Sequence, residues 1–274
     1  MGYAMVMDDL RSRGLVLLGC GKMGSALLAG WLGRGVPAKA VWVLEPQPSS
    51  WLLAQGVAVN QGLPAAPAVC LLAVKPQMME AALPSIAALG NASTLFVSIA
   101  AGTSIATFEA VLGANTPIVR AMPNTPAAVG RGITALVANG VAGAGGLALA
   151  TELMAAVGQV VHLDHERQMD AVTAVSGSGP AYVFHLIEAL AAAGEAEGLA
   201  PALAMQLARA TVVGAGELAH QASETAADLR INVTSPGGTT AAALAVLMDP
   251  DAGFPALLRR AVKAAADRGR ELAQ

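Results

Sequence analysis

The stretch Gly19-Cys20-Gly21-Lys22-Met23-Gly24 decides the fold, because it joins a short apolar run, Leu15–Leu18, to an Ala/Leu-rich stretch of helical character. Glycines with this spacing permit a tight turn and let a pyrophosphate approach backbone N–H groups at the positive end of a helix. The spacing alone is a weak signal in a chain with 30 glycines. Its context favours dinucleotide binding over a simple packing turn, because a second apolar run, Val41–Leu44, follows at the expected distance and leads into an acid, Glu45.

Apolar, β-branched runs alternate with Ala/Leu-rich stretches throughout the N-terminal part of the chain, which is the rhythm of βαβ units. Most of these runs are continuously apolar, as in a parallel sheet that helices cover on both faces. We expect strands at Leu15–Leu18, Val41–Leu44, Val69–Val74, Leu95–Ile99, Ile118–Ala121, Ile133–Val137 and Val160–Leu163, and helices at Met23–Arg34, Gln77–Leu89, Ile105–Leu112 and Leu147–Val157. The prediction is a doubly wound α/β domain over residues 1–163.

After His162 the strand-like runs disappear and long Ala/Leu/Glu stretches continue to the C-terminus, which predicts an all-helical domain over residues 164–274. Pro201, shortly after Gly198, fits the end of one helix and the start of the next. The expected helices are Arg167–Val175, Ala181–Glu197, Pro201–Gln221, Ala222–Ile231, Thr239–Leu247 and Pro255–Leu272.

The composition points to self-association. Hydrophobic residues make up 55% of the chain and charged residues 13%, so more apolar surface is present than a monomer of 274 residues usually buries. We therefore expect a homodimer or a higher homo-oligomer, although a compositional bias toward Ala and Gly would give the same numbers. The net charge of −3 and the lack of a basic cluster argue against nucleic acid as a partner.

No targeting or membrane segment is expected. The uncharged run Ala81–Phe108 contains Pro84, Gly90, Asn91, Gly102 and several hydroxyl side chains, which excludes a membrane span. Met1–Gly14 contains acids and arginines but no apolar signal core, so we expect a cytoplasmic protein with a short disordered leader. Two cysteines, Cys20 and Cys70, are too few for a disulfide framework. His162 and His165 are more simply solvated than metal-bound, so no metal is expected.

Three segments stand where predicted strands end: Ala73–Gln77, Ser98–Gly102 and Arg120–Pro126. Ligands of open α/β sheets bind beyond the carboxyl ends of the strands, so these segments should border the nicotinamide, although each alone could be a Pro-terminated turn. In the helical part, Ser235–Thr240 places a Pro-Gly-Gly turn directly before a helix. Such a helix N-terminus suits a substrate carboxylate, and ordinary capping by Ser or Thr is the alternative.

Taken in order, the segments resemble the pyrroline-5-carboxylate reductase family. The resemblance rests on the glycine loop, A-V-K-P, S-I-A-A-G, R-A-M-P-N-T-P, S-G-S-G-P-A-Y and S-P-G-G-T-T, and it extends over nearly the whole chain. It implies a Rossmann-type N-terminal domain, a C-terminal dimerisation domain, and the reduction of 1-pyrroline-5-carboxylate, a small cyclic imine, to L-proline. The alternatives are a reductase of another cyclic imine and a catalytically silent protein that senses NAD(P).

The resemblance also implies residue roles. Thr240 is expected to be catalytic and to hydrogen-bond the ring nitrogen, while the backbone of Gly238 and Thr239 holds the carboxylate. Ser235 is expected to support this loop, and Glu166 to lie near the substrate nitrogen. With the glycine loop, the expected cofactor-binding residues are Gly19, Gly21, Lys22, Met23, Gly24, Glu45, Asn60, Ala73, Val74, Lys75, Ala101 and Asn232.

Glu45 bears on the choice between NADH and NADPH. A carboxylate at this position accepts bonds from a ribose 2′-hydroxyl but repels a 2′-phosphate. No arginine lies between Arg34 and Arg120 to offset that repulsion. Because members of the family often favour NADPH, Glu45 is a departure, and we expect NADPH or NADH with a lean toward NADH. The alternative is that Glu45 turns to solvent and that Gln47, Ser49 or Ser50 contacts a phosphate.

Overall fold

The computed structural model describes residues 3–91 and 93–272, and it separates into two compact units. Unit 1 extends as far as Gly177 and includes the C-terminal segment from Ala266, whereas unit 2 is Ser178–Ala265. This division follows contacts within the chain. The functional boundary that the sequence predicts between residues 163 and 164 stays a prediction.

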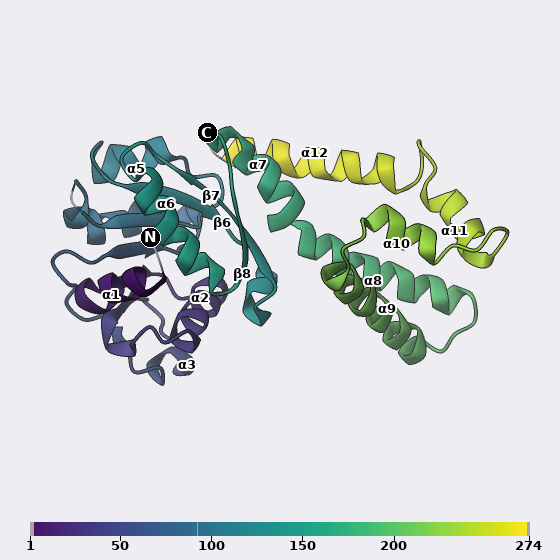
Figure 1. The fold of residues 1–274 in the computed structure, drawn as a ribbon, viewed down its shortest axis with the longest axis horizontal. Helices are drawn as coiled ribbons and strands as arrows, with labels where there is room; N and C mark the ends of the chain where they lie inside the picture. Colours follow the sequence, from purple (N-terminus) through teal and green to yellow (C-terminus); the bar gives the residue numbers. More distant parts are fainter. Residues whose placement is uncertain (1–2, 92, 273–274) are drawn as a thin grey trace. The chain divides into compact units, whose positions relative to one another are not determined.

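A β-sheet forms the centre of unit 1 (Figure 1). It has eight strands in the order β3-β2-β1-β4-β5-β6-β7-β8. Seven of its strands agree in position with the apolar runs of the sequence, whereas the two-residue β3 was not predicted. The strands are β1 (Leu15–Leu18), β2 (Val41–Leu44), β3 (Ala58–Val59), β4 (Val69–Leu72), β5 (Leu95–Ser98), β6 (Ile118–Met122), β7 (Gly132–Ala138) and β8 (Gly158–His162).

Contrary to what the apolar strands had led us to expect, the sheet is not parallel throughout, because its direction reverses between β6 and β7. Strand β7 pairs antiparallel with β6, with Arg120 opposite Val137, while all other neighbouring strands are parallel. The connection between β6 and β7 contains only the short 3₁₀ helix η3 (Thr125–Val129). A parallel crossover needs a dozen or more residues, so this short loop must turn the chain back.

Helices cover both faces of the sheet, as the sequence predicts. On one face, Leu15 and Leu17 of β1 share a core with α2 (Lys22–Gly33), where Trp31 is 1% exposed, and with α3 (Ser50–Leu53) and α6 (Gly143–Ala155). On the other face, Val16 and Leu18 pack with α4 (Pro76–Ala82), η2 (Leu83–Leu89) and α5 (Ile105–Leu112). Alternate residues of a strand point to opposite faces, so uninterrupted apolar strands supply both cores.

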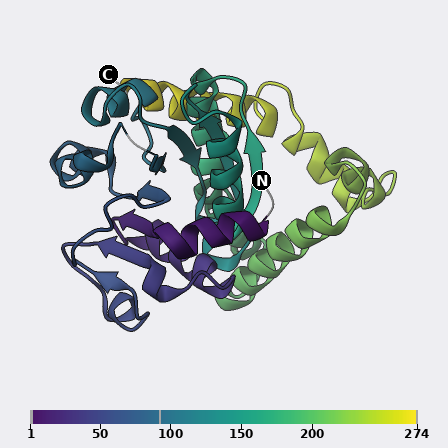
Figure 2. The ribbon, with the colours of Figure 1, turned by 60° about the vertical axis from the view of Figure 1, so that its left-hand side comes forward.

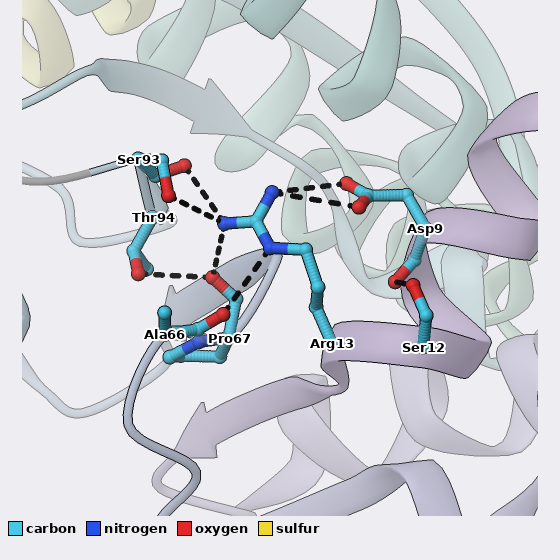
Figure 3. A network of polar contacts seen from close by, with 7 residues as sticks. All are labelled: Asp9, Ser12, Arg13, Ala66, Pro67, Ser93 and Thr94. Carbon is cyan, nitrogen blue, oxygen red and sulfur yellow. Dashed lines mark hydrogen bonds and ion pairs between the residues drawn. The ribbon is translucent and has the colours of Figure 1, made fainter.

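The expectation of a disordered leader is wrong for residues 3–13, which form helix α1 (Tyr3–Arg13) in unit 1 (Figure 2). Residues 1–2 lie outside the described part of the chain. Leu10 is 1% exposed and belongs to the core that covers β1. Arg13 at the end of the helix donates to the carbonyl oxygens of Ala66, Pro67 and Ser93 (Figure 3). Helix α1 forms because distant segments bind it, and a reading of local polarity could not detect that.

Unit 2 contains helices only, and its segments agree with those predicted to within a few residues. Helices α8 and α9 pack side by side through Ala191, Ala204 and Ala208. A five-residue π-helix, η5 (Thr173–Gly177), ends the first segment of unit 1, one residue before α8. The helices are α8 (Gly179–Ala196), α9 (Pro201–Gln221), α10 (Ala226–Asn232), α11 (Thr239–Leu247) and α12 (Phe254–Leu272).

The end of α12 belongs to unit 1 and touches the loop that follows β5. A Cβ on Gly102, which has φ +73°, would lie 3.3 Å from Cβ of Leu272. Gly269 faces Asp170, where an added Cβ would be 3.2 Å from the carboxylate. In the described residues, no helix combines the length and the apolar character that crossing a membrane would require.

Candidate active site

The glycine loop leaves β1 and opens α2 in the way the sequence predicts. Gly19 has φ +89°, and a Cβ there would lie 3.0 Å from the carbonyl carbon of Ala73. A Cβ on Gly24 would lie 2.6 Å from the carbonyl oxygen of Gly19. At Gly21 an added Cβ would meet no atom within 4 Å, and no side chain caps the helix that begins at Lys22. Two glycines are therefore required by packing, while the third leaves open space beside the unpaired N–H groups of the first helical turn.

This geometry fits a dinucleotide. The first turn of α2 presents backbone donors and the positive end of the helix dipole, which together suit a pyrophosphate. The end of the neighbouring strand lies close by, since Ala73 donates its N–H to the carbonyl of Leu18 at 2.7 Å. A Cβ on Gly19 would lie 2.9 Å from Cγ1 of Val74, so these two residues are adjacent. Lys75 is the N-cap residue of α4. The glycine loop and the segment A-V-K-P, both predicted to bind the cofactor, are thus neighbours in the structure.

Glu45 is held over the glycine loop and does not turn to solvent. Its Oε2 accepts the N–H of Cys20 at 2.7 Å, and its Oε1 accepts the N–H of Gln47 at 3.1 Å. Burial raises the pKa of the Cys20 thiol and the nearby Glu45 carboxylate raises it further, against a hydrogen bond with Ser25 that lowers it. The carboxylate is therefore a fixed negative charge at the end of β2.

Asn60 holds the backbone of Glu45 just after the end of β2. Its side-chain oxygen accepts the N–H of Glu45 at 2.9 Å, and its side-chain nitrogen donates to the carbonyl of Glu45 at 2.8 Å. The residue has φ +52°, a conformation in which asparagine is one of the tolerated residues. Asn60 was predicted to bind the cofactor, but both ends of its side-chain amide are hydrogen-bonded to the backbone of Glu45.

Two of the three segments predicted to border the nicotinamide, S-I-A-A-G and R-A-M-P-N-T-P, lie close together in unit 1. Nδ2 of Asn124 donates to Oγ of Ser176 at 3.3 Å, and Oδ1 of Asn124 accepts the N–H of Ile133 at 3.0 Å. Met122 packs with Val137, Met169 and the partly buried Ala101. The segments R-A-M-P-N-T-P and S-I-A-A-G, together with Ser176, are far apart in the sequence and meet beyond the carboxyl ends of β5 and β6.

Glu166 joins this group of segments through one carboxylate oxygen. Its Oε1 accepts a hydrogen bond from Nη1 of Arg120 at 2.6 Å and another from the N–H of Ile105 at 2.8 Å. The side chain of Arg120 is 8% exposed and that of Glu166 is 32% exposed. The residue predicted to lie near the substrate nitrogen is thus also the partner of a buried arginine.

In unit 2, the S-P-G-G-T-T segment forms a turn that opens α11. Gly237 has φ +69°, and Gly238 donates its N–H to the carbonyl of Ser235 at 3.0 Å. Gly238 is the N-cap residue of α11, and no side chain caps this helix. The N–H groups of Thr239 and Thr240 therefore have no acceptor within the helix. Asn232, a predicted cofactor residue, is the last residue of α10 and is exposed.

His162 and His165, the two histidines weighed as a metal site, have other surroundings in the structure. His162 is hydrogen-bonded to Thr151 at 2.8 Å. His165 lies at the start of η4 (Glu166–Gln168). Within residues 3–91 and 93–272, no three His, Cys, Asp or Glu side chains gather in a way that could hold a metal ion.

Comparison with known proteins identifies the family. A family model described as "Pyrroline-5-carboxylate reductase dimerisation" matches residues 166–272, and one described as "NADP oxidoreductase coenzyme F420-dependent" matches residues 15–102. A pyrroline-5-carboxylate reductase from Pseudomonas aeruginosa is 41% identical over 266 residues, which cover 95% of this chain and 97% of the relative. The chain belongs to the pyrroline-5-carboxylate reductase family.

Solved structures of pyrroline-5-carboxylate reductases are similar to this chain over most of its length. The protein from Coxiella burnetii has a TM-score of 0.88 at 33% identity, with 96% of this chain and 99% of that chain covered. The enzyme from Plasmodium falciparum, described with NADP bound, has a TM-score of 0.81 at 28% identity, with 96% and 99% covered. A further relative from Synechocystis sp. is 48% identical over 204 residues, 74% of each chain.

In this reductase, Arg120 and Asn124 stand inside the motif R-A-M-P-N-T-P, and the sequence predicts no separate role for either. A charged residue inside the apolar strand Ile118–Met122 is the signal that could have singled out Arg120, because buried arginines need a partner. The identity of that partner, 46 positions further along, comes only from the fold.

Proposed function

We propose that this member of the family reduces 1-pyrroline-5-carboxylate to L-proline with NAD(P)H, the last step of proline synthesis. The observation that carries the proposal is the S-P-G-G-T-T turn: a helix N-terminus without a side-chain cap, followed at once by the hydroxyl of Thr240. Such a turn suits a carboxylate, and it occurs in a chain that also has an open dinucleotide loop. The reduced nicotinamide, when bound, supplies the hydride.

Each end of the substrate has a proposed set of contacts. The backbone of Gly238 and Thr239 holds the substrate carboxylate at the positive end of α11, with the N–H of Thr239 as the free donor. The N–H of Gly238 is donated to the carbonyl of Ser235, and this bond keeps the turn closed. The Thr240 hydroxyl hydrogen-bonds the ring nitrogen. A hydrogen bond or a proton on that nitrogen makes the C=N carbon more electrophilic, and the carboxylate of Glu166 favours the protonated form.

The cofactor is proposed to bind through the glycine loop, with Lys22 and Met23 in the first turn of α2 and with Ala73, Val74, Lys75 and Ala101 along the strand ends. Asn232 remains a proposed contact from unit 2. Asn60 is proposed to act through Glu45, because its amide is occupied by that residue's backbone. A cytoplasmic location also remains a prediction.

NADH is the proposed preference. The two hydrogen bonds that Glu45 accepts keep its carboxylate beside the glycine loop, so it cannot move away from a 2′-phosphate without losing them. Each oxygen retains a further lone pair that can accept a ribose hydroxyl. A fixed negative charge at this point therefore disfavours NADPH more than a solvated glutamate would.

A homodimer built on the helical residues is the proposed assembly. Helix α11 is apolar, yet none of its residues is buried, and α8 leaves Phe184 60% exposed and Leu190 43% exposed. Exposed apolar surface on this scale marks an interaction site. The match of residues 166–272 to a dimerisation model supports a second copy of this chain as the partner.

The pair Thr240→Ala and Thr240→Ser tests the proposed function. Thr240→Ala is expected to lower kcat/KM for the imine about 10- to 100-fold, the scale of one hydrogen bond of about 1–3 kcal/mol in a dry site. Thr240→Ser keeps the hydroxyl and should keep much of the activity. Cofactor affinity should stay within about twofold in both, since the dinucleotide loop is untouched.

Steady-state kinetics beside a melting curve distinguishes chemistry from packing. If Thr240→Ala melts earlier but is fully active per folded molecule, the residue only stabilises its helix and the proposal is wrong. A wild type that oxidises neither NADH nor NADPH with 1-pyrroline-5-carboxylate would refute the function itself. Activity only with a six-membered cyclic imine would support a different substrate.

A further inference from the structure

Arg120 is a buried cation in a strand where every other residue is apolar. It belongs to β6, is 6% exposed, and stands opposite Ser98 of β5 and Val137 of β7. A charge in such a place is costly unless it is paired and hydrogen-bonded. Arginine is the residue best suited to a buried pair, because its planar guanidinium stays charged and offers several donors in fixed directions.

The partner of Arg120 is a carboxylate with a second task. Oε1 of Glu166 accepts a hydrogen bond from Nη1 of Arg120 at 2.6 Å. The same oxygen accepts the N–H of Ile105, the first residue of α5, at 2.8 Å. A carboxylate at the N-terminus of a helix is stabilised by the helix dipole, so both contacts hold Glu166 in one place. The three residues come from β6, α5 and η4, and all three belong to unit 1.

This arrangement leaves one oxygen of Glu166 for another donor. Both bonds end on Oε1, and no donor among the described residues binds Oε2. The side chain is 32% exposed, in contrast to the 8% of its partner. Arg120 thus anchors the buried part of the carboxylate, while the remaining oxygen is available to a ligand.

We propose that Arg120 is a positioning residue of this reductase, which fixes the carboxylate of Glu166 so that Oε2 faces the protonated ring nitrogen and stabilises its positive charge. The inference rests on the proposed function and names a residue to which that function gives no part. Arg120 itself does not touch the substrate. Its pairing sets the direction of the carboxylate, so Glu166 presents a negative charge in a fixed position to the protonated ring nitrogen.

A second consequence concerns the loop after β5. Ala101 packs against Met122, two residues beyond Arg120, and Ile105 begins the helix that follows this loop. Fixing the N–H of Ile105 therefore also fixes the exit of the S-I-A-A-G segment. Loss of the arginine should loosen the first turn of α5, which is measurable without any substrate.

The experiment compares Arg120→Met and Arg120→Lys with a matched control, Arg268→Met. Arg268 also pairs with a glutamate, Glu271, at 2.8 Å, but both side chains are more than half exposed, at 66% and 61%. The readouts are kcat and KM for 1-pyrroline-5-carboxylate, the Kd of NADH and NADPH from nucleotide fluorescence, amide exchange at Ile105, and the melting temperature.

Arg120→Met is expected to raise the imine KM about tenfold or more, the scale of a hydrogen bond to a charged group. Faster exchange of the Ile105 amide should accompany it, while the Kd of the nucleotide stays within about threefold. Arg120→Lys keeps the charge but has a shorter reach and no fork, so its KM should lie between those of the wild type and Arg120→Met. Arg268→Met should match the wild type in every readout.

Several results would overturn the proposal. An Arg120→Met enzyme with a wild-type imine KM would do so, whatever its melting temperature. An equal loss of nucleotide and imine affinity would show that the pair only maintains the fold of unit 1. If Arg120→Met does not fold, Arg120→Lys decides, and a wild-type KM in that variant refutes the positioning role. A wild type inactive with the imine would refute the proposed function first and this inference with it, whereas an active wild type with insensitive variants refutes the inference alone.

Discussion

Replacing Arg13 by alanine should destabilise the protein without affecting its activity. The guanidinium donates to the carbonyls of Ala66 at 3.2 Å, Pro67 at 3.0 Å and Ser93 at 3.1 Å, and to Oγ of Ser93 at 2.9 Å. It also pairs with Asp9 at 3.3 Å (Figure 3). One side chain therefore ties α1 to the segments that lead into β4 and β5.

The size of the effect follows from these contacts. Hydrogen bonds to a charged group contribute about 1.5–3 kcal/mol each when buried, but the Arg13 side chain is 30% exposed and the freed carbonyls can bind water. A net loss of about 2 kcal/mol is the reasonable expectation. For a folded unit of this size that corresponds to a fall in Tm of about 4–8 °C.

Calorimetry or circular dichroism at one fixed protein concentration measures the fall, since oligomerisation makes Tm depend on concentration. Arg11→Ala is the matched control in the same helix, because Arg11 pairs with Asp8 at 3.4 Å with side chains 55% and 75% exposed. Such exposed pairs contribute about 0–1 kcal/mol. The kcat/KM at 25 °C should be unchanged, because Arg13 lies at the amino ends of the strands. If Arg13→Ala melts no earlier than Arg11→Ala, the network does not hold α1 and this reasoning is wrong.

Two further predictions follow from the site and from unit 2. Glu45→Ser should improve NADPH use relative to NADH several-fold, because removing one repulsive charge from a partly solvated site is worth on the order of 1 kcal/mol. An unchanged ratio of the two kcat/KM values would show that Glu45 does not face the ribose. Light scattering at micromolar concentration should show a dimer or larger assembly, and a fully active monomer would contradict the role given to the exposed faces of α8 and α11.

The sequence predicted the strands well because their apolar runs carry the signal locally. Leu15–Leu18 and Val41–Leu44 agree with the structure residue for residue. Strand direction is not encoded in such a run, so the reversal at β7 came only with the pairing of Arg120 and Val137. Helix α1 escaped prediction for a related reason: Arg13 binds carbonyls more than fifty residues away, and no periodicity within residues 3–13 reveals them.

The site was predictable where chemistry depends on glycine and less so where it depends on pairing. The glycine loop and the S-P-G-G-T-T turn are constrained by backbone conformation, and both have the expected form. The pairing of Asn60 with the backbone of Glu45, and of Arg120 with Glu166, joins residues 15 and 46 positions apart. A single sequence that is read by itself does not reveal which two residues pair. A charged residue in an apolar strand shows only that some partner must exist.

Two arginines of unit 1, Arg13 and Arg120, show how one kind of side chain serves opposite edges of the same sheet. Arg13 gathers backbone carbonyls where β4 and β5 begin, and Arg120 gathers a carboxylate where β6 ends. In an open α/β sheet the carboxyl ends carry the ligands, so only the second arginine can influence chemistry. The expected phenotypes therefore separate by edge. Loss of Arg13 should change the melting temperature and leave the KM values alone, whereas loss of Arg120 should change the imine KM at temperatures where the protein is fully folded.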